Sequence, residues 1–204
     1  MPSPSGGEPQ YTLPSGRLRV LAAFNYREYR LFWIGGAFSN LGIWALMAGR
    51  LWLMHDLTKS PVMLGLLTLS SMGPVLLLSV WGGVVADRVN RLRLLTISRA
   101  MFSLLAFLTG FLVTFDVIES WHLIAISLVT GVLLSFDIPS RQAIVPNLVK
   151  QEHLLNAIVL YYFLFSSSAV IGPSFFAPLV NFLGIDGLFF YVGVTYALTV
   201  ATLM

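Results

Sequence analysis

The 204-residue sequence contains no cysteine and few charged residues. Without cysteine, a disulfide framework and a Cys-based metal site are excluded. Charged residues make up 10% of the chain, whereas soluble domains usually carry about 25%. Hydrophobic residues make up 57%, and a soluble fold of this length would still leave roughly 30% of its unfolded chain's surface in water. The composition therefore indicates a chain whose solvent is a lipid bilayer.

Six apolar runs are long enough to cross a bilayer, since a spanning helix needs about 20 mostly apolar residues. They cover approximately residues 29–54, 62–86, 92–115, 121–138, 154–183 and 187–204. None alternates between apolar and polar residues as the strands of a membrane barrel do. The sequence therefore predicts an all-α membrane protein, a six-transmembrane-helix bundle, in which the stretch from Pro139 to His153 connects the fourth and fifth spans.

The two ends of the chain carry separate signals. Residues 1–20 are rich in Pro, Gly and Ser and lack the basic start and apolar core of a signal peptide. We expect them to form a disordered cytoplasmic tail. The sixth run reaches only 18 residues before the sequence stops at Met204, and no basic residue follows it. We therefore expect the chain to be a fragment that continues into further spans.

Lysine and arginine lie almost entirely on one side of the predicted spans. Those before the first span and after the second and fourth are Arg17, Arg19, Arg27, Arg30, Arg88, Arg91, Arg93, Arg99, Arg141 and Lys150. The opposite side has Lys59, and Arg50 lies within the first span. Basic residues mark cytoplasmic loops, so we expect a cell-membrane protein with a cytoplasmic N-terminus. Because these clusters separate apolar runs, the net charge of +3 does not indicate a nucleic-acid partner.

No motif in the sequence fits an intramembrane enzyme. Such an enzyme needs a nucleophile with a base, paired acids or metal ligands at membrane depth. The chain has no G-x-S-x-G and no H-E-x-x-H, and His55, His122 and His153 all lie at span ends. We expect no catalytic residue, no cofactor and no metal site.

Two Gly-Pro pairs suggest an internal repeat. Gly73-Pro74 lies in the second span and Gly172-Pro173 in the fifth, and each proline is 13 residues before an aspartate that ends its span. Transporters built from inverted three-helix repeats retain such matches, and Gly-Pro pairs are positions where a helix bends. The alternative is chance, because glycine and proline are frequent in membrane helices.

The connection after the second span carries a recognisable motif. The segment from Gly82 to Arg93 reads GGVVADRVNRLR and resembles G-x-L-A-D-R-x-G-R-K/R, which major facilitator superfamily transporters carry between helices 2 and 3. The matching residues are Gly83, Ala86, Asp87, Arg88 and Arg91. Asn90 replaces the second glycine, and asparagine also tolerates a left-handed turn. The resemblance implies that this chain is the N-terminal half of a major facilitator fold, a 3+3 inverted repeat.

The resemblance also implies a cytoplasmic gate. Gly83 would let a helix of the other half approach closely. Asp87 would face the positive end of a helix dipole, and Arg88 and Arg91 would bridge to acidic partners. The alternative is an ordinary basic loop that follows a helix-ending aspartate.

The resemblance extends to one branch of this superfamily, through segments 137–143, 146–149 and 155–157. They are similar to the D-x-P-A/S-R-Q-A, P-x-L-V and L-x-N-A patterns of the branch that contains enterobactin exporters and macrolide efflux proteins. This resemblance implies an antiporter in the bilayer that exports an amphipathic, drug-like or siderophore-like small molecule from the cell, with a proton as the candidate coupling ion. However, residues 123–136 of the fourth span lack the basic residue that many proton-driven exporters carry there.

Three further sites follow from single residues. Asp137 and Arg141 are four apart and would face each other on a continuous helix, although Pro139 can interrupt it. We interpret them as a structural or gating pair on the cytoplasmic side. Arg50 either extends to the outer interface or meets an anionic substrate in a cavity. Asn40 lies near mid-membrane, where it would line a substrate pathway or join two helices.

Two functions remain open on the sequence. The first is a secondary active exporter that works by alternating access, with a missing C-terminal six-helix half as its partner. The second is a six-helix structural or channel-like subunit that acts as an oligomer.

Overall fold

The computed structural model describes residues 17–203, and of residues 17–20, 86, 87, 175, 202 and 203 it describes the backbone alone. The helices are η1 (Arg17–Asn25), α1 (Arg27–Thr58), α2 (Pro61–Arg88), α3 (Arg91–Thr114), α4 (Ser120–Leu148), η2 (Gln151–His153) and α5 (Leu154–Leu203). They provide six membrane-length apolar segments in the described part of the chain, which confirms the predicted fold class. Residues 1–16 of the predicted tail lie outside the described residues, and η1 begins within the range 1–20 assigned to that tail.

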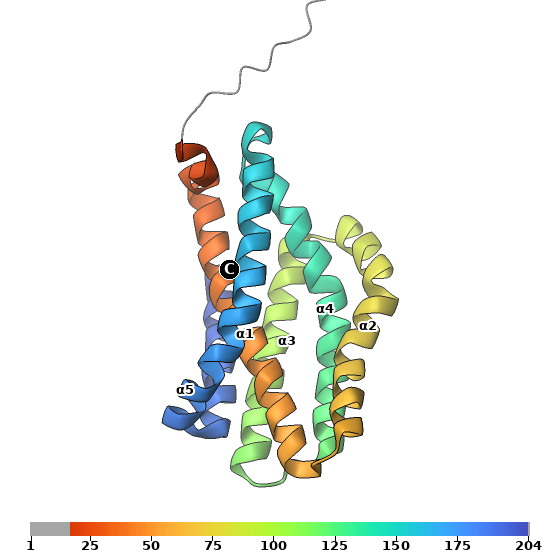
Figure 1. Cartoon of the computed structure of the whole chain (residues 1–204). Coiled ribbons are helices and arrows are strands. Elements are labelled where there is room, and N and C mark those ends of the chain that lie inside the picture. The colour runs from red at the N-terminus through yellow and green to blue at the C-terminus, as the bar shows by residue number, and fades with distance from the viewer. Residues whose placement is uncertain (1–16, 204) are drawn as a thin grey trace, which may run out of the picture.

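The helices form one bundle with a common long axis (Figure 1). α4 packs most extensively on α2, α1 packs on α5, and α3 contacts both α4 and α5. α5 contains two spans, because Gly184 has φ 75° and ψ 172° and reverses the chain there. This backbone conformation suits glycine, which has no Cβ to clash. The reversal lies within the predicted connection 184–187.

The outer surface of the bundle is apolar. On α2, for example, Leu76, Leu77, Val80 and Trp81 are all exposed, and they lie on one face of the helix. A soluble protein rarely leaves so continuous an apolar strip uncovered. The exterior therefore suits contact with lipid chains or with other membrane helices.

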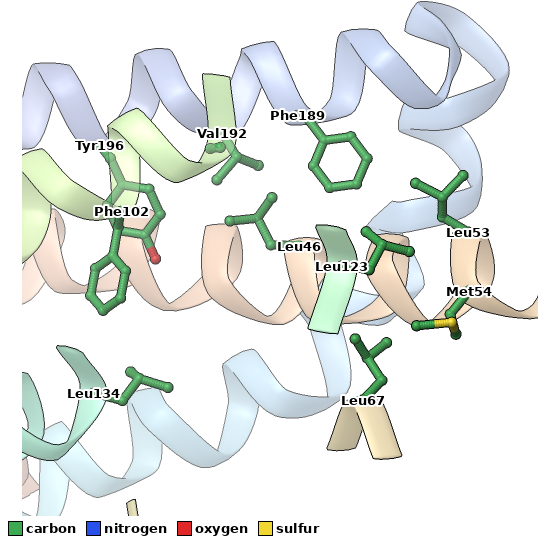
Figure 2. Packing of buried hydrophobic residues seen from close by; sticks show 11 residues of the cluster. Leu46, Leu53, Met54, Leu67, Phe102, Leu123, Leu134, Phe189, Val192 and Tyr196 are labelled. Carbon is green, nitrogen blue, oxygen red and sulfur yellow. The ribbon is translucent and has the colours of Figure 1, made fainter. Parts of the chain in front are cut away.

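The main core joins all five α-helices (Figure 2). Leu46 and Leu53 of α1 face Phe189 and Val192 of the second span of α5, whereas Met54 points toward Leu67 of α2. Side chains of α2, α3 and α4 complete it: Leu67, Phe102, Ala106, Leu123 and Leu134. This core joins five of the six spans, because its α5 residues all belong to the second span of that helix.

α2 and α4 approach closely beside Pro74. Proline has no N–H, so the carbonyl of Ser70 loses its helical partner. Gly131 of α4 lies against this carbonyl, and a Cβ on Gly131 would be 3.1 Å from the Ser70 oxygen and closer still to that of Ser71. Ser135 adds a hydrogen bond by donating to the Pro74 carbonyl at 3.0 Å. The helix is therefore stabilised at its proline by the neighbouring helix.

The predicted end of the fourth span at residue 138 is wrong, because α4 continues to Leu148 through Pro139 and Pro146. Pro139 leaves the carbonyl of Ser135 without its helical partner. Gly82 of α2 lies directly against that carbonyl, where any Cβ would overlap it. Proline is tolerated in membrane helices that are buried against neighbouring helices, as α4 is against α2 here.

A row of hydrogen bonds joins η1 and the start of α1 to η2 and the start of α5. The Ala23 amide donates to Asn156 Oδ1 at 3.0 Å, and the Tyr26 hydroxyl lies 3.0 Å from His153 Nδ1. One helical turn further, the Tyr29 hydroxyl donates to the Ala157 carbonyl at 2.8 Å. These contacts fix the entry of the first span against the start of the fifth.

Candidate functional site

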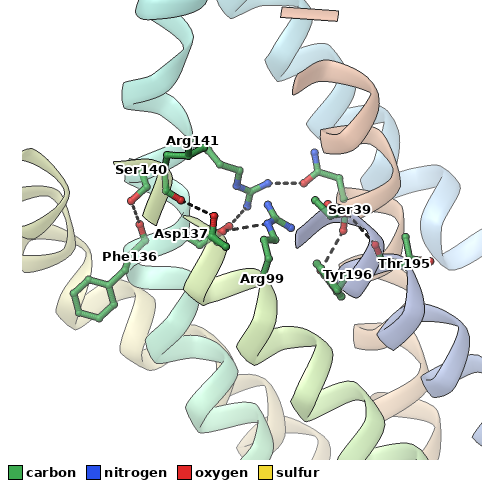
Figure 3. Close-up of polar contacts among 12 residues, drawn as sticks. Ser39, Arg99, Phe136, Asp137, Ser140, Arg141, Thr195 and Tyr196 are labelled. Atoms are coloured by element: carbon green, nitrogen blue, oxygen red, sulfur yellow. Dashed lines mark hydrogen bonds and ion pairs between the residues drawn. The ribbon is translucent and has the colours of Figure 1, made fainter. Parts of the chain in front are cut away.

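A buried group of charges lies between α3 and α4 (Figure 3). Asp137 of α4 is fully buried. Its Oδ2 forms an ion pair with Arg141 Nη2 at 2.6 Å, and its Oδ1 forms a second one with Arg99 Nε at 3.5 Å. The continuous α4 places Asp137 and Arg141 on the same face, one turn apart. The predicted pair is thus brought together despite Pro139.

Asn40 and Tyr196 connect this charge cluster to α1 and to the second span of α5. Arg141 Nη1 donates to Asn40 Oδ1 at 2.8 Å, and the Arg99 guanidinium lies 5.5 Å from the centre of the Tyr196 ring. The Tyr196 hydroxyl donates to the Ser39 carbonyl at 3.1 Å. Four spans therefore meet in one polar network. Asn40 takes part in it as an interhelical contact and does not line the pocket described below.

The cluster holds two guanidinium groups and one carboxylate in the bundle interior. Breaking a buried ion pair costs about 3–5 kcal/mol, because the remaining charge is left unpaired. Separating α4 from α3 would break the Asp137–Arg99 pair and carry this cost, whereas separating α4 from α1 would break the Arg141–Asn40 hydrogen bond. The network therefore favours movement of these helices as one body.

Arg99 differs from the other basic residues that follow the second span. It lies just over two turns into α3 and is buried. The buried residues Leu95, Phe102 and Ala106 flank it at helical spacing. This pattern was visible in the sequence and identifies Arg99 as part of the inward face.

A pocket opens between α1, α2, α3 and α4, and Arg50 lines it. Arg50 is only 6% exposed, and its Nη1 donates to Thr130 Oγ1 of α4 at 2.9 Å. The interpretation that Arg50 extends to the outer interface is therefore wrong. The other lining residues are Ile43, Leu46, Met47, Leu51, Leu67, Thr68, Ser71, Met72, Phe102, Ser127, Thr130 and Leu134. Sequence reasoning gave no role to Thr130, because threonine is unremarkable in a membrane helix.

The structure places the gate residues at the end of α2 and the start of α3. A Cβ atom added to Gly83 would have no described atom within 4 Å, so the face of α2 at Gly83 is open in this six-helix unit. Arg88 is exposed, and Arg91 Nη1 donates to the Ala143 carbonyl near the end of α4 at 2.8 Å. The side chain of Asp87 lies outside the described residues.

Asn90 acts as a helix cap. Its backbone is extended, with φ −61° and ψ 109°, which differs from the expected left-handed turn. Its Oδ1 accepts hydrogen bonds from the amides of Leu92 and Arg93, at 3.0 and 3.2 Å. Asparagine is one of the best residues for this role, and it fixes where α3 begins.

The two Gly-Pro pairs lie within continuous helices but pack differently. Gly172 lies against α1, where a Cβ would be 2.5 Å from that of Trp44 and 3.3 Å from the Leu41 carbonyl. Gly73 contacts only Leu69 of its own helix. In the second span, Gly131 of the neighbouring helix provides the close approach at Pro74. Pro173 is exposed, whereas Pro74 is buried.

Comparison with known proteins gives two matches. The family model described as transmembrane secretion effector matches residues 19–204. Over 135 residues the chain is 31% identical to the staphyloferrin A transporter of Staphylococcus aureus (strain NCTC 8325 / PS 47). That match covers 66% of this chain but only 34% of the relative. No solved structure matches the chain significantly.

Proposed function

Since the chain belongs to the transmembrane secretion effector family of major facilitator superfamily transporters, we propose that it is the N-terminal half of a secondary active exporter. This exporter moves amphipathic small molecules, drug-like or siderophore-like, out of the cell by alternating access. The family match over residues 19–204 carries the proposal. The six membrane-length helices agree with it.

Direction and cargo rest on the comparisons. The family's description as a secretion effector supports outward transport. The name of the staphyloferrin A transporter supports a siderophore-like cargo. The exposed basic residues Arg88, Arg93 and Lys150 support a cytoplasmic position for the connections after the second and fourth spans. The proposed location is the cell membrane, with the N-terminus in the cytoplasm.

The mechanism requires a second six-helix half. In alternating access, two halves rock against each other around a central site. The charge cluster around Asp137 ties α1, α3, α4 and α5 together, so this half would move as one body. The open face at Gly83 is the surface on which a helix of the other half would pack. An ion gradient drives the cycle, and the proton is the first ion to test.

The substitution Asp87→Asn tests the gate in the full-length protein. We expect it to reduce dye efflux from cells at least tenfold while leaving the amount of protein in the membrane unchanged, because the asparagine lacks the charge that faces a helix dipole. The matched control is Asp116→Asn, in the loop between α3 and α4. Asp116 has φ 56°, which asparagine tolerates well.

Efflux by Asp87→Asn at the level of the control would contradict the gate. Efflux in energised vesicles should also stop when the proton gradient is collapsed. Flux that continued without any ion gradient, through the six-helix unit alone, would replace the exporter with a channel-like oligomer.

A further inference from the structure

Arg50 is a buried cation that no acidic side chain of the described residues neutralises. It forms no ion pair with a described residue, in contrast to Arg99 and Arg141, which share Asp137. The nearest acid on its own helix, Asp56, is exposed and pairs with Lys59 at 2.6 Å. A charge at membrane depth is costly and normally faces a partner or a wet cavity. The hydroxyl of Thr130 supplies one neutral hydrogen bond and no charge.

The side chain retains an unused donor. Arg50 Nε is buried and has no hydrogen-bond partner in the part of the chain that the structure describes. From its position in α1, Arg50 lies about 12 Å from the outer end of the helix, at 1.5 Å per residue. At this depth, and buried as it is, the guanidinium does not reach the membrane interface. A counter-ion for Arg50 would therefore have to bind in the pocket that Arg50 lines.

Three hydroxyl groups that line the pocket can accept hydrogen bonds from a bound molecule. Thr68, Ser71 and Thr130 donate their own hydrogens to backbone carbonyls of their helices, at 2.7–2.9 Å. Their oxygens keep lone pairs for other donors. Arg50 is thus the strong donor of the site. The rest of the wall is mostly apolar, with Leu46, Met47 and Phe102 among its residues.

We propose that this pocket binds a carboxylate group of an amphipathic substrate, with Arg50 as its charge partner and the α2 and α4 hydroxyls as acceptors for donor groups of the same molecule. A carboxylate supplies the missing charge and fits the planar guanidinium. The apolar wall holds the body of the molecule. This inference rests on the proposed function, since it names the chemical class of the transported substrate.

Two probes that differ only in charge test the inference. Dansylglycine carries a free carboxylate, and dansylglycinamide carries a neutral amide on the same aromatic body. Binding to the full-length protein in lipid nanodiscs is followed by dansyl fluorescence. We expect the carboxylate probe to bind about tenfold or more tightly than the amide, as for a charged hydrogen bond.

Variants assign the preference to Arg50. Arg50→Gln keeps a donor for Thr130 but removes the charge, and should abolish the preference, while Arg50→Lys should retain part of it. The matched control Arg93→Gln removes an exposed charge and should leave the preference unchanged. Size-exclusion chromatography and thermal melting check that each variant is folded.

Three results would overturn the inference: equal binding of the two probes, no binding of either, or a preference that survives in Arg50→Gln. Among these, a preference that survives would fit a cation contributed by the other half. The proposed function is tested separately by dye efflux. Carboxylate preference without efflux would refute transport and keep the site, whereas efflux without the preference would refute the site alone.

Discussion

The charge cluster makes a quantitative prediction for Asp137→Asn. At an effective dielectric constant of about 20, unit charges at the observed separations of 2.6 and 3.5 Å attract by about 6 and 5 kcal/mol. Desolvation of the three groups offsets most of this attraction. Loss of the carboxylate leaves two guanidinium groups buried side by side. We expect the free energy of unfolding to fall by about 3–5 kcal/mol.

Two comparison variants isolate the effect of burial. Asp56→Asn makes the same chemical change in an ion pair of the same length, 2.6 Å, but both side chains there are more than half exposed. It should leave stability almost unchanged. Arg99→Gln removes the excess cation and leaves the Asp137–Arg141 pair intact, so the loss should be smaller, about 1–2 kcal/mol.

The assay is unfolding of the full-length protein in detergent micelles, followed by tryptophan fluorescence. The expected order of destabilisation is Asp137→Asn, then Arg99→Gln, then Asp56→Asn. If Asp137→Asn were no more destabilising than Asp56→Asn, burial would not control the energy of the cluster. If Arg99→Gln were the most destabilising, the assignment of Asp137 as the shared partner would be refuted.

Two further predictions concern α2 and its connection to α3. Gly82→Val should destabilise the protein by about 1–3 kcal/mol, because its side chain would overlap the Ser135 carbonyl. Gly83→Val meets no described neighbour, so it should destabilise the protein less than Gly82→Val does, and equal melting temperatures for the two variants would contradict the packing. Asn90→Ala should cost about 1 kcal/mol through loss of the α3 cap, with Asn90→Ser retaining most of the stability. Faster amide hydrogen exchange at Leu92 and Arg93 in Asn90→Ala would identify the cap as the cause.

The sequence was sufficient for the number and type of helices, because hydrophobic length is a strong local signal. It was also sufficient for the reversal in the last helix, where Gly184 meets the conformational need directly. The predicted end of the fourth span was wrong because Pro139 was taken to end the helix, whereas α4 continues through it. The close packing beside Pro139 involves Gly82, which lies on another helix and cannot be deduced from the local sequence.

The buried arginines show the same limit for the site. Counting basic residues between spans places Arg99 and Arg141 with the charges of the connecting loops. In the structure both are buried, and both form ion pairs with Asp137. Helical spacing along α3 could have identified Arg99. No sequence pattern linked Arg50 to Thr130 or Asn40 to Arg141, because these contacts depend on how the helices pack.

The hydrogen bonds between the start of α1 and the start of α5 have a consequence for biosynthesis. The bonded residues are 127 to 133 positions apart in the chain. A ribosome adds about 5–20 residues per second, so the first span leaves it roughly 6–27 s before its partners exist. During that interval Tyr29 and the Ala23 amide must find temporary partners in the translocon, a chaperone or interfacial water. Premature release of the nascent chain would expose this unpaired end to degradation.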